Sequence, residues 1–167
     1  TVIGTSGQTV VDDFVNFRTT VKGLLASLGV AHIVDAFDGE SALARMSAAK
    51  YDIILCDYNL GPGKDGQQVL EEAKHYKYIS YMTIFMMVTA ENSMDMVMGA
   101  VEYMPDDYLM KPFTKQMLEK KLLTILEKKI ALREIIQTIE LMDYEKALTL
   151  CDEAIGKVPK HISEVLR

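Results

Sequence analysis

The sequence predicts an α/β protein with a five-stranded parallel sheet and helices on both faces. Short apolar runs alternate with amphipathic segments through the first two thirds of the chain. This alternation is typical of units in which each helix crosses back over the sheet between two parallel strands. A length of 167 residues, 49% of them hydrophobic, fits one such domain with a short helical extension at the C-terminus.

The predicted strands are short runs rich in apolar residues. The third is continuously apolar after its first residue, as expected for a strand buried on both faces in the middle of a parallel sheet. It contains Cys56, which we interpret as a small buried hydrophobic residue in a reduced, cytoplasmic protein. The five predicted strands span residues 9–11, 31–34, 52–56, 83–88 and 107–110.

Helices are predicted after each strand. Gly29 ends the first of them, because glycine is common just beyond a helix C-terminus. Thr114 is placed to cap the start of the last one. The predicted helices span residues 14–28, 41–49, 66–74 and 93–103, and a long segment from 114 to 142 that contains neither glycine nor proline.

Polar residues stand at the ends of four predicted strands. Asp12 and Asp13 follow the first, Asp57 the third, Thr89 the fourth and Lys111 the fifth. In the flavodoxin-like strand order 2-1-3-4-5, strands one and three are neighbours, and ligands bind at the carboxyl ends of the strands. Three carboxylates would then share one crevice, where Mg²⁺ and a lysine can offset their repulsion.

This set of residues suits phosphoryl transfer. A carboxylate can act as the nucleophile and form an aspartyl-phosphate, and the reaction chiefly needs positioning and charge neutralisation. Each residue alone has a simpler explanation: an Asp pair can cap a helix, and an isolated lysine is usually a solvated surface charge. Their joint placement at four strand ends favours the phosphoryl-transfer site.

Four motifs surround the strand-end residues. They are Val11-Asp12-Asp13, Asp57-Tyr58-Asn59-Leu60 with Gly61 to Gly66, Val88-Thr89-Ala90, and Asp107-Tyr108-Leu109-Met110-Lys111-Pro112-Phe113. With these motifs, the segment from about residue 9 to residue 126 resembles a response-regulator receiver domain of two-component signalling. One departure is Met104-Pro105, where the family usually has Gly-Ala.

The resemblance implies that Asp57 is the phosphoacceptor. It further implies that Asp13, Asp57 and the backbone carbonyl of Asn59 bind Mg²⁺ directly, while Asp12 holds a metal-bound water. The expected donor is a sensor histidine kinase or a phosphotransfer protein. The domain would be a signalling module rather than a conventional enzyme.

The same resemblance implies a conformational switch at the phosphorylated site. Thr89 and Lys111 would bind the phosphoryl oxygens, and Thr89, Ala90 and Tyr108 would form the switch. The bond between Lys111 and Pro112 is often cis in similar proteins.

The phosphoryl group is expected to be short-lived. Asn59 and Glu91 should stand at the mouth of the crevice, where an amide and a carboxylate can orient the attacking water. The same pair occurs in chemotaxis-type receivers, which this portion resembles.

Two other functions compete with this hypothesis. A haloacid-dehalogenase-like phosphatase also uses an aspartate nucleophile and magnesium, but it expects a second aspartate where this chain has Asn59, which cannot serve as acid or base. A structural adaptor that is never phosphorylated would usually lack one of the acidic residues.

Residues 127–167 are predicted to form a helical hairpin with its turn near Met142 and Asp143. The hairpin resembles a truncated tetratricopeptide repeat that binds a downstream protein, although Ala131 and Ile135 stand where the repeat usually has Trp and Gly. We favour packing of the long helix on a neighbour over a homodimer seam. The residues that carry the resemblance are Tyr144, Ala147, Ala154 and Pro159.

The net charge of −6 argues against nonspecific nucleic-acid binding. No stretch of the chain is long and apolar enough to span a membrane. Because the chain starts at Thr1 and stops within a helical pattern, we expect it to be part of a longer protein.

Overall fold

The computed structural model describes residues 7–90 and 103–156. The chain divides into two compact units, Thr1–Leu126 and Glu127–Arg167. The described elements are, in chain order, β1 (Gln8–Val11), α1 (Val15–Ser27), β2 (Ile33–Ala36), α2 (Gly39–Ala48), β3 (Ile53–Asp57), α3 (Gly66–His75), β4 (Ile84–Ala90), β5 (Asp107–Lys111), α5 (Lys115–Glu140) and α6 (Tyr144–Gly156).

The sheet has the predicted strand order, β2-β1-β3-β4-β5, and every neighbouring pair is parallel. Val11 at the end of β1 pairs with Cys56, and Asp57 at the end of β3 pairs with Val88. Ala90 at the end of β4 pairs with Lys111, the last residue of β5. The carboxyl ends of the four strands that carry the predicted site therefore meet along one edge.

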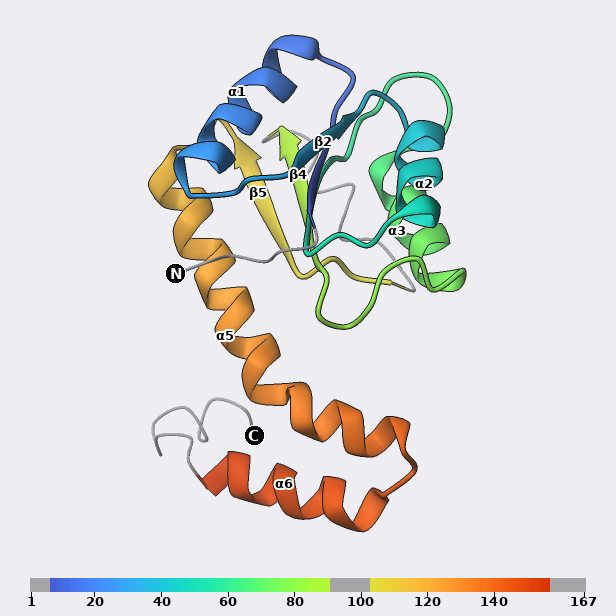
Figure 1. The fold of residues 1–167 in the computed structure, drawn as a ribbon, viewed down its shortest axis with the longest axis vertical. Helices are drawn as coiled ribbons and strands as arrows, with labels where there is room; N and C mark the ends of the chain where they lie inside the picture. The colour runs from blue at the N-terminus through green and yellow to red at the C-terminus, as the bar shows by residue number, and fades with distance from the viewer. Residues whose placement is uncertain (1–6, 91–102, 157–167) are drawn as a thin grey trace. The chain divides into compact units, whose positions relative to one another are not determined.

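Two hydrophobic clusters cover the two faces of the sheet, because successive strand residues point to opposite sides. In β3, Ile54 belongs to the cluster that includes α2 and α3, while Leu55 belongs to the cluster that includes α1 and α5. Figure 1 shows α1 on one side of the sheet and the pair α2 and α3 on the other. The prediction of helices on both faces is confirmed.

Several boundaries differ from the prediction. β2 lies two residues later, because its pairing with β1 runs from Ile33 to Ala36. α2 starts at Gly39 instead of residue 41 because Asp38 caps it: Ser41 N donates to Asp38 Oδ1 at 2.8 Å, and Asp38 N donates to Ser41 Oγ at 3.2 Å. The predicted helix 93–103 falls almost entirely outside the described residues.

The last two helices break where the sequence predicts. α5 ends at Glu140, Met142 has a φ of 59°, and Asp143 Oδ1 accepts a hydrogen bond from Lys146 N at 3.2 Å at the start of α6. In Figure 1, α6 folds back along the last part of α5 within the second unit. The tetratricopeptide assignment stays a prediction, since any helical hairpin has this form. Among the described residues, no helix could cross a membrane.

Candidate functional site

Three carboxylates meet at the carboxyl edge of the sheet. One oxygen from each of Asp12, Asp13 and Asp57 lies within 4.8 Å of the others. Asp12 is fully buried and Asp57 is 6% exposed, whereas Asp13 is exposed to solvent. The adjacency of β1 and β3 produces this cluster, because the Asp pair directly follows β1 and Asp57 ends β3.

Lys111 neutralises part of this charge. Its Nζ donates to Asp12 Oδ2 at 2.7 Å and to Asp57 Oδ2 at 2.6 Å. Asn59 N donates to Asp57 Oδ1 at 3.3 Å, so both oxygens of that carboxylate accept hydrogen bonds. The bond between Lys111 and Pro112 is cis, as the family resemblance implied.

Burial sets the protonation of the site. The pKa of Asp57 is raised to about 6: burial raises it most, Lys111 lowers it, and the Asp12 carboxylate adds to the rise. Burial lowers the pKa of Lys111, but the hydrogen bonds to Asp12 and Asp57 outweigh that effect and the pKa lies above its ordinary value. Lys111 therefore stays charged at neutral pH, while the Asp57 carboxyl has a pKa of about 6.

The acidic cluster opens into a cleft of about 530 Å³. Asp57 faces this cleft, so a small phosphorylated molecule or a partner side chain can reach it. The residues that line the cleft are Asp13, Phe14, Phe17, Asp57, Asn59, Gly61, Ala90 and Lys111.

The other predicted site residues lie at different distances from the cluster. Thr89 is buried, and its hydroxyl donates to the Ala90 carbonyl oxygen at 3.2 Å. Tyr108 packs partly buried against the core shared by α2 and α3, and its hydroxyl has no hydrogen-bond partner among the described residues. Glu91 lies outside the described part of the chain.

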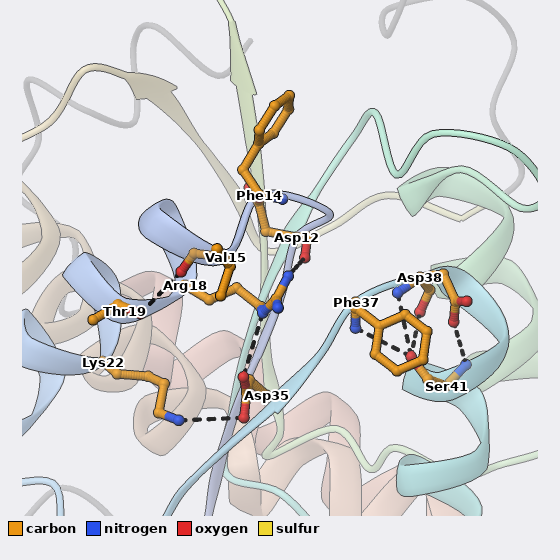
Figure 2. Close-up of polar contacts among 10 residues, drawn as sticks. All are labelled: Asp12, Phe14, Val15, Arg18, Thr19, Lys22, Asp35, Phe37, Asp38 and Ser41. Carbon is orange, nitrogen blue, oxygen red and sulfur yellow. Dashed lines mark hydrogen bonds and ion pairs between the residues drawn. The ribbon is translucent and has the colours of Figure 1, made fainter.

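Sequence reasoning missed Arg18, which holds the turn after β1. Its Nη1 donates to the Asp12 carbonyl oxygen at 2.6 Å and its Nε donates to Asp35 Oδ2 at 3.3 Å, as Figure 2 shows. Lys22 Nζ reaches the other oxygen of Asp35 at 3.2 Å, and Phe14 N donates to Asp12 Oδ1 at 2.7 Å. No local signal separates this arginine from a surface residue, because its partners come from the turn after β1 and from β2.

Gly66 allows the close approach of α3 to β3, the strand that ends in Asp57. A Cβ at this position would overlap the Asp57 carbonyl oxygen and lie 2.8 Å from Met87 Sδ. Gly66 N also donates to the Tyr58 carbonyl oxygen at 2.8 Å. The loop between Asp57 and α3 is held tightly against the sheet as a result.

The donor set fits a hard divalent cation. All three side chains offer carboxylate oxygens, which are the ligands that Mg²⁺ prefers. When the three carboxylates are ionised, Lys111 balances only one of their charges. A cation with two positive charges would balance the remainder.

Comparisons with known proteins agree with this geometry. The family model described as "Response regulator receiver domain" matches residues 9–123. The chemotaxis protein CheY of Pseudomonas aeruginosa is 33% identical over 119 residues, which are 71% of this chain and 94% of that protein. CheY-3 of Vibrio cholerae is 32% identical over 119 residues, which are 71% of this chain and 90% of that protein.

Solved structures show the same fold. The receiver domain of NtrX from Brucella abortus superposes with a TM-score of 0.63 at 27% identity, over 72% of this chain and 98% of that one. A longer NtrX structure gives a TM-score of 0.68 at 26% identity, over 80% of this chain but only 29% of that one. Most of the C-terminal helical segment lies beyond the end of the family match at residue 123.

Proposed function

This chain belongs to the response-regulator receiver family, and we propose that it accepts a phosphoryl group on Asp57. The observation that carries the proposal is the Lys111 ammonium, which lies between Asp12 and Asp57 beside an open cleft. Receivers interact with histidine kinases or phosphotransfer proteins, so the proposed donor is a phosphohistidine on such a partner. An oxygen of Asp57 attacks phosphorus, the bond from phosphorus to the donor nitrogen breaks, and the imidazole leaves with its electron pair.

The residues of the site divide this work. Asn59 N and Lys111 each bond one oxygen of Asp57 and so orient the nucleophile. Lys111 and Thr89 then donate hydrogen bonds to the oxygens of the transferred group. The exposed cleft admits the donor side chain, and the buried position of Asp12 keeps its carboxylate at the base of the site.

We propose that Asp13, Asp57 and the Asn59 backbone carbonyl would bind Mg²⁺ directly, and that Asp12 would hold a metal-bound water. When bound, Mg²⁺ supplies positive charge that offsets the negative charge of the carboxylates and the phosphoryl group. Asp13→Ala should weaken Mg²⁺ affinity in an NMR titration of the metal-free protein. An unchanged affinity would remove Asp13 from the ligand set.

The phosphorylation site itself is tested by intact-mass spectrometry after treatment with acetyl phosphate and Mg²⁺. The wild-type protein should gain one phosphoryl mass, and Asp57→Asn should gain none because its amide is not a nucleophile. Asp152→Asn changes an exposed carboxylate on α6 and is the matched control. A phosphoryl mass on Asp57→Asn would assign the acceptor elsewhere.

The switch in this proposal consists of Thr89, Ala90 and Tyr108. The Thr89 hydroxyl donates to the neighbouring Ala90 carbonyl oxygen, and we propose that it turns to a phosphoryl oxygen after phosphorylation. The hydroxyl oxygen of the partly buried Tyr108 has no hydrogen-bond partner among the described residues, so it can form a hydrogen bond in a second state. NMR spectra recorded with and without phosphorylation should show shifts at Thr89 and Tyr108.

The lifetime of the phosphoryl group is proposed to depend on Asn59 and Glu91. Asn59 lines the cleft, where an amide can orient water without shielding the phosphorus. Asn59→Lys and Glu91→Lys should slow the decay of the phosphorylated protein. Equal decay in both variants and the wild type would remove this role.

The C-terminal hairpin is the proposed output element. Leu141, Met142, Tyr144 and Leu148 expose large apolar side chains there, as a protein-binding repeat would. Pull-down of a downstream protein by the full chain, lost in Leu148→Asp, would support this output.

We also propose that the protein acts in the cytoplasm.

A further inference from the structure

The ring of Phe17 lies against the ammonium of Lys111. Nζ is 3.9 Å from the ring centroid, well inside the range of about 6 Å over which a ring face attracts a cation. The same nitrogen donates to Asp12 Oδ2 and Asp57 Oδ2. An ammonium has three N–H donors, so two serve the carboxylates and the ring covers another side.

The position of the Phe17 ring is itself well defined. Phe17 packs partly buried against the core cluster that includes α1 and α5. Phe113, two residues after Lys111, meets it edge to face with centroids 5.8 Å apart and ring planes at 86°. Contacts with the core and with a second ring thus position the Phe17 ring independently of its contact with the ammonium.

An aromatic neighbour suits a lysine that must exchange partners. When a phosphoryl group joins Asp57, the Lys111 ammonium has to release Asp57 Oδ2 and bond a phosphoryl oxygen. A ring face attracts the cation without directional hydrogen bonds, so the ammonium can turn toward the new oxygen and remain in place. A water or a third carboxylate at that position would bind a donor and compete with the phosphoryl group.

We propose that Phe17 is a positioning residue for the phosphorylation of Asp57. Its ring face holds the Lys111 ammonium between Asp12 and Asp57, in reach of the incoming phosphoryl oxygens. This inference rests on the proposed function, because it concerns the rate of that reaction. Phe17 also lines the cleft, so the ring lies along the route of the donor.

Three variants of the full chain test the proposal. Phe17→Leu removes the ring face but keeps an apolar side chain in the core, and Phe17→Tyr restores the ring face. Leu24→Val is the matched control, since Leu24 lies on the same helix and packs against the same core cluster. One readout is the NMR shift of the Lys111 ε protons without metal or donor; the other is the initial rate of phosphorylation by acetyl phosphate with Mg²⁺.

The ring current of Phe17 should displace the Lys111 ε-proton signals in the wild type. We expect Phe17→Leu to lose this displacement and to slow phosphorylation about three- to ten-fold, while Phe17→Tyr and Leu24→Val stay within about two-fold of the wild-type rate.

The positioning role would be overturned if Phe17→Leu were phosphorylated at the wild-type rate. It would also be overturned if the phosphorylation rate of Phe17→Tyr or of Leu24→Val fell as much as that of Phe17→Leu. Failure of the wild type to gain a phosphoryl mass would instead refute the proposed function. In that case, Lys111 ε-proton shifts that stay unchanged in Phe17→Leu would still refute the contact. Loss of the ring-current displacement in this variant would still support the placement of the ammonium by the ring.

Discussion

The Asp57 carboxyl lies in a largely buried environment that disfavours its ionised form. Burial raises its pKa to about 6, and the neighbouring Asp12 adds to the effect while Lys111 opposes it. The folded-state pKa thus lies above the unfolded-state value of about 4, so folding favours the protonated carboxyl. The contribution of Asp57 to stability is fully present below about pH 4 and is lost as the pH rises through about 6.

Asp57→Asn should therefore stabilise the metal-free protein at neutral pH. We expect the free energy of unfolding to rise by about 1–3 kcal/mol at pH 7.5, and the gain should shrink toward zero near pH 4. Urea denaturation of both proteins with EDTA at a series of pH values measures the difference. A gain that is independent of pH would mean that the carboxylate charge is not its cause.

Asp35 shows the opposite behaviour. Burial raises its pKa, but hydrogen bonds and charge from Lys22 and Arg18 outweigh burial and lower it overall. The stability that this carboxylate contributes is present above its unfolded-state pKa of about 4 and is lost as the pH falls through the lower folded-state value. The side chain is 40% exposed, so solvent screens its ion pairs.

Asp35→Asn should destabilise the protein by no more than about 1 kcal/mol at pH 7. The difference from the wild type should decrease as the pH is lowered below about 4, because the wild-type Asp35 is then protonated and, like the asparagine, uncharged. Denaturant titrations at pH 7 and at lower pH values compare the two proteins. A constant difference across this range would contradict the ion-pair explanation.

At the scale of elements, the helices begin in two different ways: some are capped by a nearby side chain, and one depends on hydrogen bonds made by a residue of the site. α2 and α3 both begin with a capping box, formed by Asp38 with Ser41 and by Asp65 with Gln68. α1 begins at Val15, and the N-cap residue before it, Phe14, makes no side-chain capping hydrogen bond. The turn before α1 instead depends on the hydrogen bonds that Asp12 accepts from Phe14 and Arg18.

Two glycines in helices should respond oppositely to alanine. A Cβ at Gly66 would overlap the Asp57 backbone and meet Met87 Sδ at 2.8 Å, whereas a Cβ at Gly23 meets nothing within 4 Å. Gly66→Ala should lower the free energy of unfolding by about 2 kcal/mol or more. Gly23→Ala should raise it by about 0.5–1 kcal/mol through helix propensity and chain entropy.

Thermal and urea denaturation of the two glycine variants provide the measurement, and each variant is the control for the other. A neutral Gly66→Ala would show that α3 can move away from the sheet without cost. A destabilised Gly23→Ala would contradict the open space around that position.

At the scale of the whole molecule, the chain consists of two compact units. The core of the first unit includes Leu118, Leu122 and Ile125 from the part of α5 that precedes residue 127. The family match also ends before that point, at residue 123. We therefore propose that residues 1–126 form a receiver that folds without the hairpin.

A fragment that ends at Leu126 should fold cooperatively and accept a phosphoryl group from acetyl phosphate. The fragment retains the sheet, the described site residues and the α5 residues that belong to the core of the first unit. Circular dichroism with thermal denaturation tests folding, and intact-mass spectrometry tests phosphorylation, each beside the full chain. A fragment without a cooperative transition would show that the second unit is needed for the stability of the first.

The order and type of the described elements follow from the sequence, because apolar periodicity and glycine or proline punctuation are local properties. The gathering of Asp12, Asp13, Asp57 and Lys111 could be predicted as well, since parallel strands bring their carboxyl ends to one edge. Boundaries shifted where a cap or a strand pairing outweighed the local pattern, as at Asp38 and in β2.

By itself the sequence determined the fold class, the strand order and the set of acidic and basic residues at the strand ends. Only the tertiary structure decided which additional side chains reach that set. Arg18 meets Asp35, and Phe17 meets Lys111, across separations of 17 and 94 positions in the chain. Such contacts depend on how the helices pack on the folded sheet, and no local pattern of residues specifies which distant side chains this packing brings together.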